Sequence, residues 1–211
     1  MDLAFLHNRH SVRQFKDEPV PEAVITELIA AATCAPSGKN RQNWHFVVVA
    51  NKEKIAAIAR IVSAKNAELC AQLRDETKLK TLRASAGYHI AFKDAPVLVL
   101  VYAGPYETVA DMLLADGVMT AAEAQCYARP QPGIQNIAAA MENLLLAAAN
   151  SGYGGCWMTG PTYAAKEISE YIGFSKAGYD LAAMTPLGVP ATAKQSSPPR
   201  KPLDEVLTII R

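Results

Sequence analysis

Apolar residues recur along this chain at helical spacing in some segments and in unbroken β-branched runs in others. The helical spacing is clearest after Pro21 and after Gly133. Pro21 suits the first turn of a helix, and Pro36 would end that helix. The segment 134–150 is apolar almost all round, so we expect it to be the core helix. The predicted helices cover residues 3–8, 21–34, 51–62, 134–150 and 164–172, and residues 63–90 have a helical composition with ambiguous limits.

Three apolar runs rich in β-branched residues predict strands. They cover residues 44–49, 95–102 and 182–190. The second run is apolar on both faces, so we expect it in the centre of a sheet. Residues 104–133 have a weak pattern between two strong elements. Irregular insertions of this kind often cover a site, and we take residues 104–132 as a candidate substrate lid.

The end of the chain is predicted to pair with a sheet edge. Residues 191–203 are rich in proline, serine and lysine, and they lead to the apolar residues 206–210. A β-branched end would be poorly soluble if it were left free, so we expect it to pair with an edge of its own sheet or of a partner's sheet.

Composition favours one soluble domain over residues 1–211 and excludes several classes of protein. The formal net charge of +1 gives no general attraction to nucleic acid or to an acidic membrane, so any anion must be bound by a local cluster. The four cysteines form no Cys-x-x-Cys pair, which indicates neither a zinc site nor a disulfide framework, and we expect no metal. No signal peptide or apolar run of roughly 20 residues is recognisable, so we expect a cytoplasmic protein.

The segment Arg9-His10-Ser11-Val12-Arg13 places two guanidinium groups and a hydroxyl at alternate positions. In an extended chain Arg9, Ser11 and Arg13 would share one face, which suits a phosphate because arginine binds phosphate through a planar fork of donors. His10 would face the other way, which favours a structural role for its side chain. Taken alone, the same pattern is more often a solvated basic turn.

Six separated motifs run through nearly the whole chain. They are Arg9-His10-Ser11-Val12-Arg13; Ala35-Pro36-Ser37-Gly38-Lys39-Asn40 with Gln42 and Trp44; Asp94-Ala95-Pro96-Val97; Gly152-Tyr153-Gly154-Gly155-Cys156-Trp157; Gly188 with Pro190; and Pro199-Arg200-Lys201-Pro202-Leu203. Each motif is weak alone, but in this order they resemble the nitroreductase family of flavin enzymes.

The resemblance implies an α+β fold with a central, mostly antiparallel sheet flanked by helices. It also implies an intertwined homodimer that binds FMN at the subunit interface, with the C-terminal extension, residues 191–211, crossing the partner. Arg9, His10, Ser11 and Arg13 match the first FMN-binding segment. The remaining cofactor-binding residues that the resemblance implies are Pro36, Ser37, Asn40 and Gln42 from the other subunit's loop, Gly154 and Gly155 along the ring, and Arg200 and Lys201 as a second phosphate clamp.

Elementary chemistry agrees with this assignment. A phosphate needs a local cationic cluster, which Arg9, Arg13, Arg200 and Lys201 would supply. Glycine lets the backbone approach a flat ring, and Arg13 would stabilise negative charge at flavin N1 and the C2 carbonyl. No side chain is needed as a nucleophile.

Structural readings compete at each of these positions. The glycines could be a helix cap and turn, Ser37 and Asn40 could be loop formers, and Arg200 and Lys201 could solubilise the tail. Cys156 is more often a small core residue than a redox partner.

The sequence departs from the family's usual pattern at Asn43, where proline normally precedes the tryptophan. Losing proline frees φ and restores an N–H, which predicts a looser or differently bonded loop. A further flavin contact from the region after the first strand is left unassigned, with Lys65 and Asn66 as the possibilities.

The function implied is an FMN-dependent oxidoreductase working by a ping-pong mechanism, in which hydride passes from NAD(P)H through flavin N5 to a nitroaromatic, quinone or activated alkene. One alternative is a specialised flavin enzyme, of the oxidase, dehalogenase or flavin-fragmenting type, that is poorly served by NAD(P)H. A second alternative is a non-catalytic module that stores or senses FMN.

Overall fold

The computed structural model describes residues 3–192 and 198–211. The strands are β1 (Trp44–Val49), β2 (Val97–Ala103), β3 (Gly154–Gly155) and β4 (Asp180–Gly188). The α-helices are α1 (Ala4–Asn8), α2 (Glu22–Thr33), α3 (Lys52–Gln72), α4 (Glu76–His89), α5 (Val109–Ala115), α6 (Ala121–Ala128), α7 (Pro132–Asn150) and α8 (Ala165–Ile172). Short 3-10 turns cover Gly38–Asn40, Gly160–Ala164 and Leu203–Glu205.

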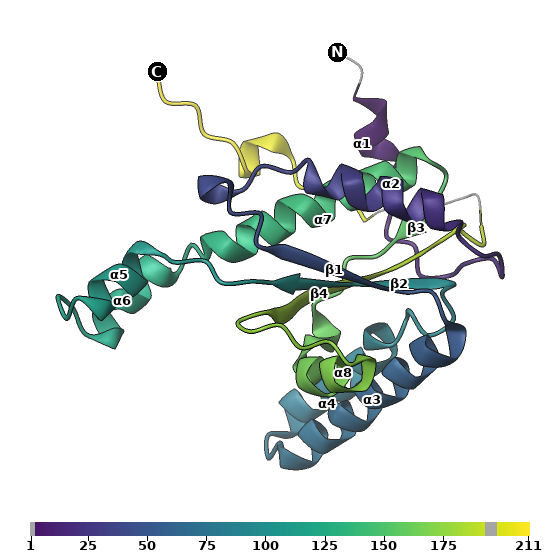
Figure 1. Cartoon of the computed structure of the whole chain (residues 1–211), viewed down its shortest axis with the longest axis horizontal. Helices are drawn as coiled ribbons and strands as arrows, with labels where there is room; N and C mark the ends of the chain where they lie inside the picture. The colour runs from purple at the N-terminus through teal and green to yellow at the C-terminus, as the bar shows by residue number, and fades with distance from the viewer. Residues whose placement is uncertain (1–2, 193–197) are drawn as a thin grey trace.

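The four strands form one antiparallel sheet in the order β1-β2-β4-β3. Helices α2 and α7 cover one face, and α3, α4 and α8 lie on the other, as Figure 1 shows. The predicted α+β class with a central antiparallel sheet and flanking helices is confirmed.

Strand β2 is central because its side chains enter a core on each face. Val97, Val99 and Val101 belong to the cluster on the α2 and α7 side. Leu98 and Leu100 belong to the cluster on the α3 and α8 side. Successive side chains of a strand point to opposite faces, so an unbroken apolar run is what a strand between two helical layers requires.

The ambiguous region 63–90 contains two helices. Helix α3 continues to Gln72, and α4 begins after Asp75, whose carboxylate accepts hydrogen bonds from the backbone N–H groups of Thr77 and Lys78 at 2.9 and 3.0 Å. This N-cap explains the break, because it satisfies N–H groups that have no partner inside the helix.

The weakly patterned region also contains two helices, α5 and α6, which project from the body as an arm (Figure 1). Each begins with a capping box, Thr108 with Asp111 and Thr120 with Glu123. The buried residues of the two helices are Ala110 and Ala124. The arm therefore presents most of its side chains outward.

The tail, residues 198–211, lies along the outside and ends with exposed apolar side chains, among them Ile209 and Ile210. Within the described ranges, the tail pairs with no strand of its own sheet. Part of the predicted extension, residues 193–197, lies outside the described residues. Among the helices that the structure describes, none has the length and apolar character needed to cross a membrane.

Candidate functional site

The basic segment after α1 is extended and is held beside the glycine segment that follows α7. Ser11 forms a parallel bridge with Gly155, and the Val12 N–H donates to the Gly155 carbonyl at 2.8 Å. Val12 is buried, whereas Ser11 and Arg13 are exposed, as the alternation predicted. Two of the predicted binding segments, far apart in sequence, therefore lie side by side. Ser11 and Arg13 present one donor-rich surface there.

Arg9 is turned partly into the protein, toward helix α7. Its side chain is 20% exposed, and its Nε lies 3.9 Å from Oε1 of Glu142. An anion bound by Arg9 must therefore share the guanidinium with this carboxylate. His10 lies next to Arg9, is half-buried, and lines the adjacent pocket.

Each of the three glycines after α7 is required by a different feature of the local structure. Gly152 ends the helix with a φ of 79°, and the Tyr153 N–H donates to the Ala148 carbonyl at 2.8 Å, which is a Schellman cap. A Cβ on Gly154 would lie 2.7 Å from the Cβ of Val12. A Cβ on Gly155 would lie 2.9 Å from the Pro186 carbonyl oxygen.

Gly152 is therefore part of a helix cap. Gly154 and Gly155 are needed because neighbouring atoms of the protein pack closely against their backbone. Cys156 behaves as a small core residue, because it is buried and its N–H donates to Oγ1 of Thr185 at 3.1 Å.

A small pocket lies between the basic and glycine segments. Its volume is about 120 Å³, and it is lined by Asn8, His10, Val12, Leu145, Ala149, Gly152, Tyr153, Gly154, Gly155 and Pro190. Pockets that hold small-molecule ligands usually measure roughly 300–1,000 Å³. The pocket in the described part of the chain is therefore smaller than a usual ligand site.

The loop before β1 carries the predicted residues Pro36, Ser37, Asn40 and Gln42. Pro36, Asn40 and Gln42 are exposed, and Asn40 and Gln42 have positive φ values of 49° and 44°. Ser37 Oγ accepts the Gln42 N–H at 3.0 Å, and Asn40 Oδ1 accepts a hydrogen bond from Gln42 Nε2 at 3.0 Å. Loop formation accounts for Ser37 and Asn40, while the exposed side of the loop is accessible to a ligand.

Asn43 is buried, with 4% exposure, and it makes this loop differently bonded rather than looser. Its Nδ2 donates to the carbonyl oxygens of Gly104 and Gly133, and its Oδ1 accepts from Asn136. A residue before proline is confined to extended conformations. Because the backbone of Gln42 is in the left-handed conformation, asparagine is better suited to position 43 than proline.

The second part of the predicted phosphate clamp lies on the exposed tail. Arg200 and Lys201 are exposed, and Arg200 donates to the Pro198 carbonyl at 3.1 Å.

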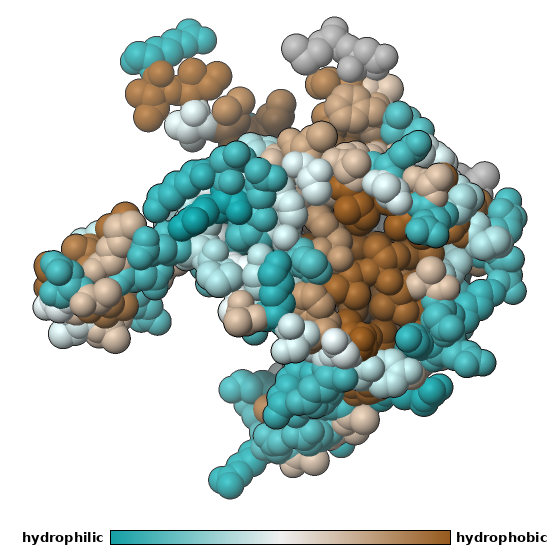
Figure 2. Space-filling model, in the orientation of Figure 1, coloured by the Kyte–Doolittle hydropathy of each residue, from teal (hydrophilic) through white to brown (hydrophobic). Residues whose placement is uncertain are grey.

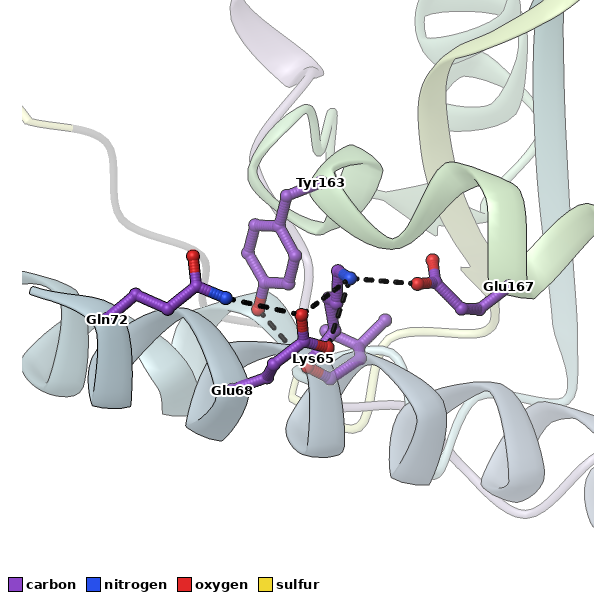
Figure 3. Close-up of polar contacts among 6 residues, drawn as sticks. Lys65, Glu68, Gln72, Tyr163 and Glu167 are labelled. Atoms are coloured by element: carbon purple, nitrogen blue, oxygen red, sulfur yellow. Dashed lines mark hydrogen bonds and ion pairs between the residues drawn. The ribbon is translucent and has the colours of Figure 1, made fainter.

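Lys65 bridges α3 and α8 (Figure 3), and both helices lie on the sheet face opposite α2 and α7 (Figure 1). Its Nζ lies 3.0 Å from Glu167 Oε1 and 3.0 Å from Glu68 Oε2. The hydrogen bond to Glu167, and then that to Glu68, raise the pKa of Lys65. Asn66 is buried and accepts a hydrogen bond from the Cys70 thiol at 3.6 Å. Lys65 thus ties α3 to α8, while the buried Nδ2 of Asn66 has no hydrogen-bond partner among the described residues.

Two histidines in the described part of the chain have lowered pKa values. Burial lowers the pKa of His89 and, together with the charge of Lys176, that of His45. In the described part of the chain, no group of three or more His, Cys, Asp or Glu side chains could hold a metal ion. The cysteines are free, with Cys70 and Cys156 buried and Cys34 and Cys126 exposed.

Comparison with known proteins gives both family and fold. Residues 6–189 match the model of the Nitroreductase family. A BluB-like flavoprotein from Clostridium difficile 630 is 36% identical over the whole of both chains, with a TM-score of 0.90. A nitroreductase with bound FMN from Bacteroides fragilis NCTC 9343 is 23% identical, with a TM-score of 0.70 over 99% of this chain and 98% of that one, which shows likeness of fold.

A curated relative, a putative NADH dehydrogenase/NAD(P)H nitroreductase of Methanothermobacter thermautotrophicus, is 27% identical over 155 residues. The match covers 74% of this chain and 59% of the relative. The chain spans about half the length of the first curated relatives that it matches, with 59%, 49% and 39% of them covered.

Proposed function

The chain belongs to the Nitroreductase family, and on this premise we propose that it is an FMN-dependent oxidoreductase that uses NAD(P)H to reduce an electron-poor acceptor. The observation that carries the proposal is the bridge between Ser11 and Gly155, which unites two segments that match the family's cofactor-binding motifs. The names of a flavoprotein relative, an FMN-bound structural neighbour and an NAD(P)H nitroreductase relative support it.

The residues present suit the phosphate end of FMN. Ser11 is exposed two residues after Arg9, so a hydroxyl and a guanidinium can converge on one anion. The chain as a whole has a formal net charge of +1, so attraction for a phosphate must come from this local cluster. Arg200 and Lys201 are proposed to complete the clamp.

When bound, FMN would supply the hydride acceptor and donor, and no side chain need act as a nucleophile. The protein's part is to bind, to orient and to tune. Arg13 would place positive charge near the pyrimidine edge of the ring, where it favours the reduced form. The backbone of Gly154 and Gly155 would run along the ring, and Pro36, Ser37, Asn40 and Gln42 would cover it from a second subunit.

We propose that the chain forms a homodimer, and the surfaces that one chain leaves exposed support this. Figure 2 shows an apolar patch in the region of α2 and the edge strand β1. A groove of about 460 Å³ lies there, lined by Val20, Glu22, Ile25, Thr26, Ile29, Val48 and Ala50. The apolar residues 206–210 of a second copy would cover this groove and pair with the free edge of β1.

The arm is proposed to be the lid that selects the acceptor. Val109, Met112, Val118 and Tyr127 expose between 43% and 63% of their surface on it. Apolar side chains presented outward on a projecting element suit closure over an aromatic or quinone acceptor in the dimer. We thus propose a single domain, 1–211, carrying a lid and a crossing tail.

The test is the absorption spectrum of the purified full chain, followed by anaerobic mixing with NADH and with NADPH. We expect a yellow protein with an FMN spectrum that is bleached by at least one donor and restored by a nitroaromatic or a quinone. Bound FMN that neither donor reduces would favour the specialised oxidase, dehalogenase or flavin-fragmenting alternative. Reduction without reoxidation by any acceptor would favour a storage or sensing module, and protein without FMN would refute the proposal.

A further inference from the structure

Both ends of the arm meet at one buried side chain. The Asn43 amide donates to the Gly104 carbonyl, where the arm leaves β2, at 3.1 Å, and to the Gly133 carbonyl, where it enters α7, at 3.2 Å. The Asn43 backbone carbonyl also accepts the Gly104 N–H at 2.6 Å. A single residue thus closes the base of a projection of almost thirty residues.

The same amide is connected to the loop that carries the proposed flavin contacts. Asn43 Oδ1 accepts from Asn136 Nδ2 at 2.8 Å, and Asn136 Oδ1 accepts the Gly38 N–H at 2.9 Å. Asn136 is 5% exposed. A continuous chain of hydrogen bonds therefore runs from the loop, through two buried amides, to both ends of the arm.

Tyr106 packs into the same joint. A Cβ on Gly38 would collide with the Tyr106 hydroxyl, and a Cβ on Gly133 would lie 2.8 Å from the Tyr106 Cβ. The arm base therefore touches the loop directly as well as through the amides. The two glycines leave room for this approach.

We propose that the Asn43–Asn136 amide pair is a positioning element that fixes the arm relative to the loop Gly38–Gln42 and so sets how the lid lies over the acceptor. The acceptor part of this inference rests on the proposed function, whereas the joint itself does not. Asparagine is suited to the position because it offers two donors and an acceptor, whereas aspartate keeps only acceptors and proline has no polar side-chain group. Since both amides are buried, a lost partner is not replaced by water.

The test compares Asn43→Asp with Asn143→Asp in the full chain, by hydrogen exchange. Asn143 is the matched control, because its half-buried amide on α7 donates to the Ala31 carbonyl of α2 at 3.4 Å. For Asn43→Asp we expect exchange over residues 104–133 to rise roughly ten- to a hundredfold, the range for losing buried polar partners. Exchange in α3 and β2 should stay within twofold of wild type, and Asn143→Asp should leave the arm unchanged.

A second variant keeps the inference testable if Asn43→Asp does not fold. Asn136→Ala leaves the two Asn43 donors in place, so we expect faster exchange over residues 38–42 with the arm ends still protected. Arm exchange within twofold of wild type in Asn43→Asp, or equal loosening of arm and sheet, would overturn the inference.

In the flavin-loaded enzyme, Asn43→Asp should change KM for a bulky acceptor tenfold or more while flavin reduction by NAD(P)H changes less than threefold. An unchanged acceptor KM would overturn the lid part of the inference. Because the exchange measurement needs neither flavin nor turnover, a wild-type chain without FMN would refute the proposed function and leave the joint to be decided by exchange.

Discussion

Removing the Arg9 guanidinium should weaken FMN binding, and the structure sets the size of the effect. A charge-assisted hydrogen bond to phosphate contributes roughly 1.5–3 kcal/mol. Arg9 must also leave or share Glu142, 3.9 Å away, and a partly exposed ion pair of this kind is worth about 0.2–1 kcal/mol. The expected loss of FMN-binding free energy in Arg9→Ala is therefore roughly 0.5–2.8 kcal/mol, which raises Kd about 2- to 100-fold.

The same geometry predicts an effect of opposite sign at the neighbouring carboxylate. Glu142→Gln removes the group that competes with phosphate for Arg9, so FMN should bind up to about fivefold more tightly. The assay is titration of the apoprotein with FMN at fixed salt, because exposed charge interactions are screened. Arg60→Ala, an exposed arginine on α3, is the control for loss of one positive charge. Equal Kd values for Arg9→Ala and Arg60→Ala would refute the phosphate assignment.

Two further predictions concern stability. Gly155→Ala should lower the free energy of unfolding, measured in urea, by about 1–3 kcal/mol, because its Cβ would lie 2.9 Å from the Pro186 carbonyl oxygen. Gly87→Ala, with open space around it in α4, should raise the free energy of unfolding by roughly 0.4–1 kcal/mol. Equal effects of the two substitutions would contradict the packing explanation. Burial lowers the pKa of His89 below its ordinary 6.5, so the contribution of neutral His89 to folding stability is complete above pH 6.5 and is lost as the pH falls through the lowered pKa. His89→Gln should therefore flatten the fall in Tm between pH 7 and pH 5. An unchanged fall in Tm would exclude His89 as its source.

Much of the fold could be predicted because buried helices and strands require apolar residues at regular spacing in the sequence. The apolar run 95–102 identified a central strand, and the all-round apolar segment 134–150 identified the core helix α7. The bounds of the arm helices could not be predicted, because these helices bury little and so carry almost no apolar period. Their signal was instead the pair of capping boxes at Thr108 and Thr120, which is a local signal that does not need a core.

The site was less predictable, because its contacts join residues far apart in sequence. The resemblance of motifs selected both Ser11 and Gly155, but only the structure shows that they are bridged. Gly154 and Gly155 were expected to make room for a ring, and the structure shows that they also make room for protein atoms, because a Cβ there would meet Val12 and Pro186. Asn43 could be noticed as an unusual residue, but its partners at 104, 133 and 136 could not be inferred, because side-chain amides leave no periodic pattern.

The central claim, a flavin site built from two chains, is tested most directly by mixed dimers. Arg9→Ala damages the phosphate half, and Asn40→Gly damages the loop half while tolerating the positive φ at that position. A heterodimer of the two variants, isolated through different tags, should contain one site with both defects and one site with none.

Binding of one FMN per heterodimer at wild-type affinity, with each variant homodimer weakened at both sites, is the result we predict. If each site were built from a single chain, every site of the heterodimer would carry one defect. Two weakened sites and no wild-type site would then contradict the account.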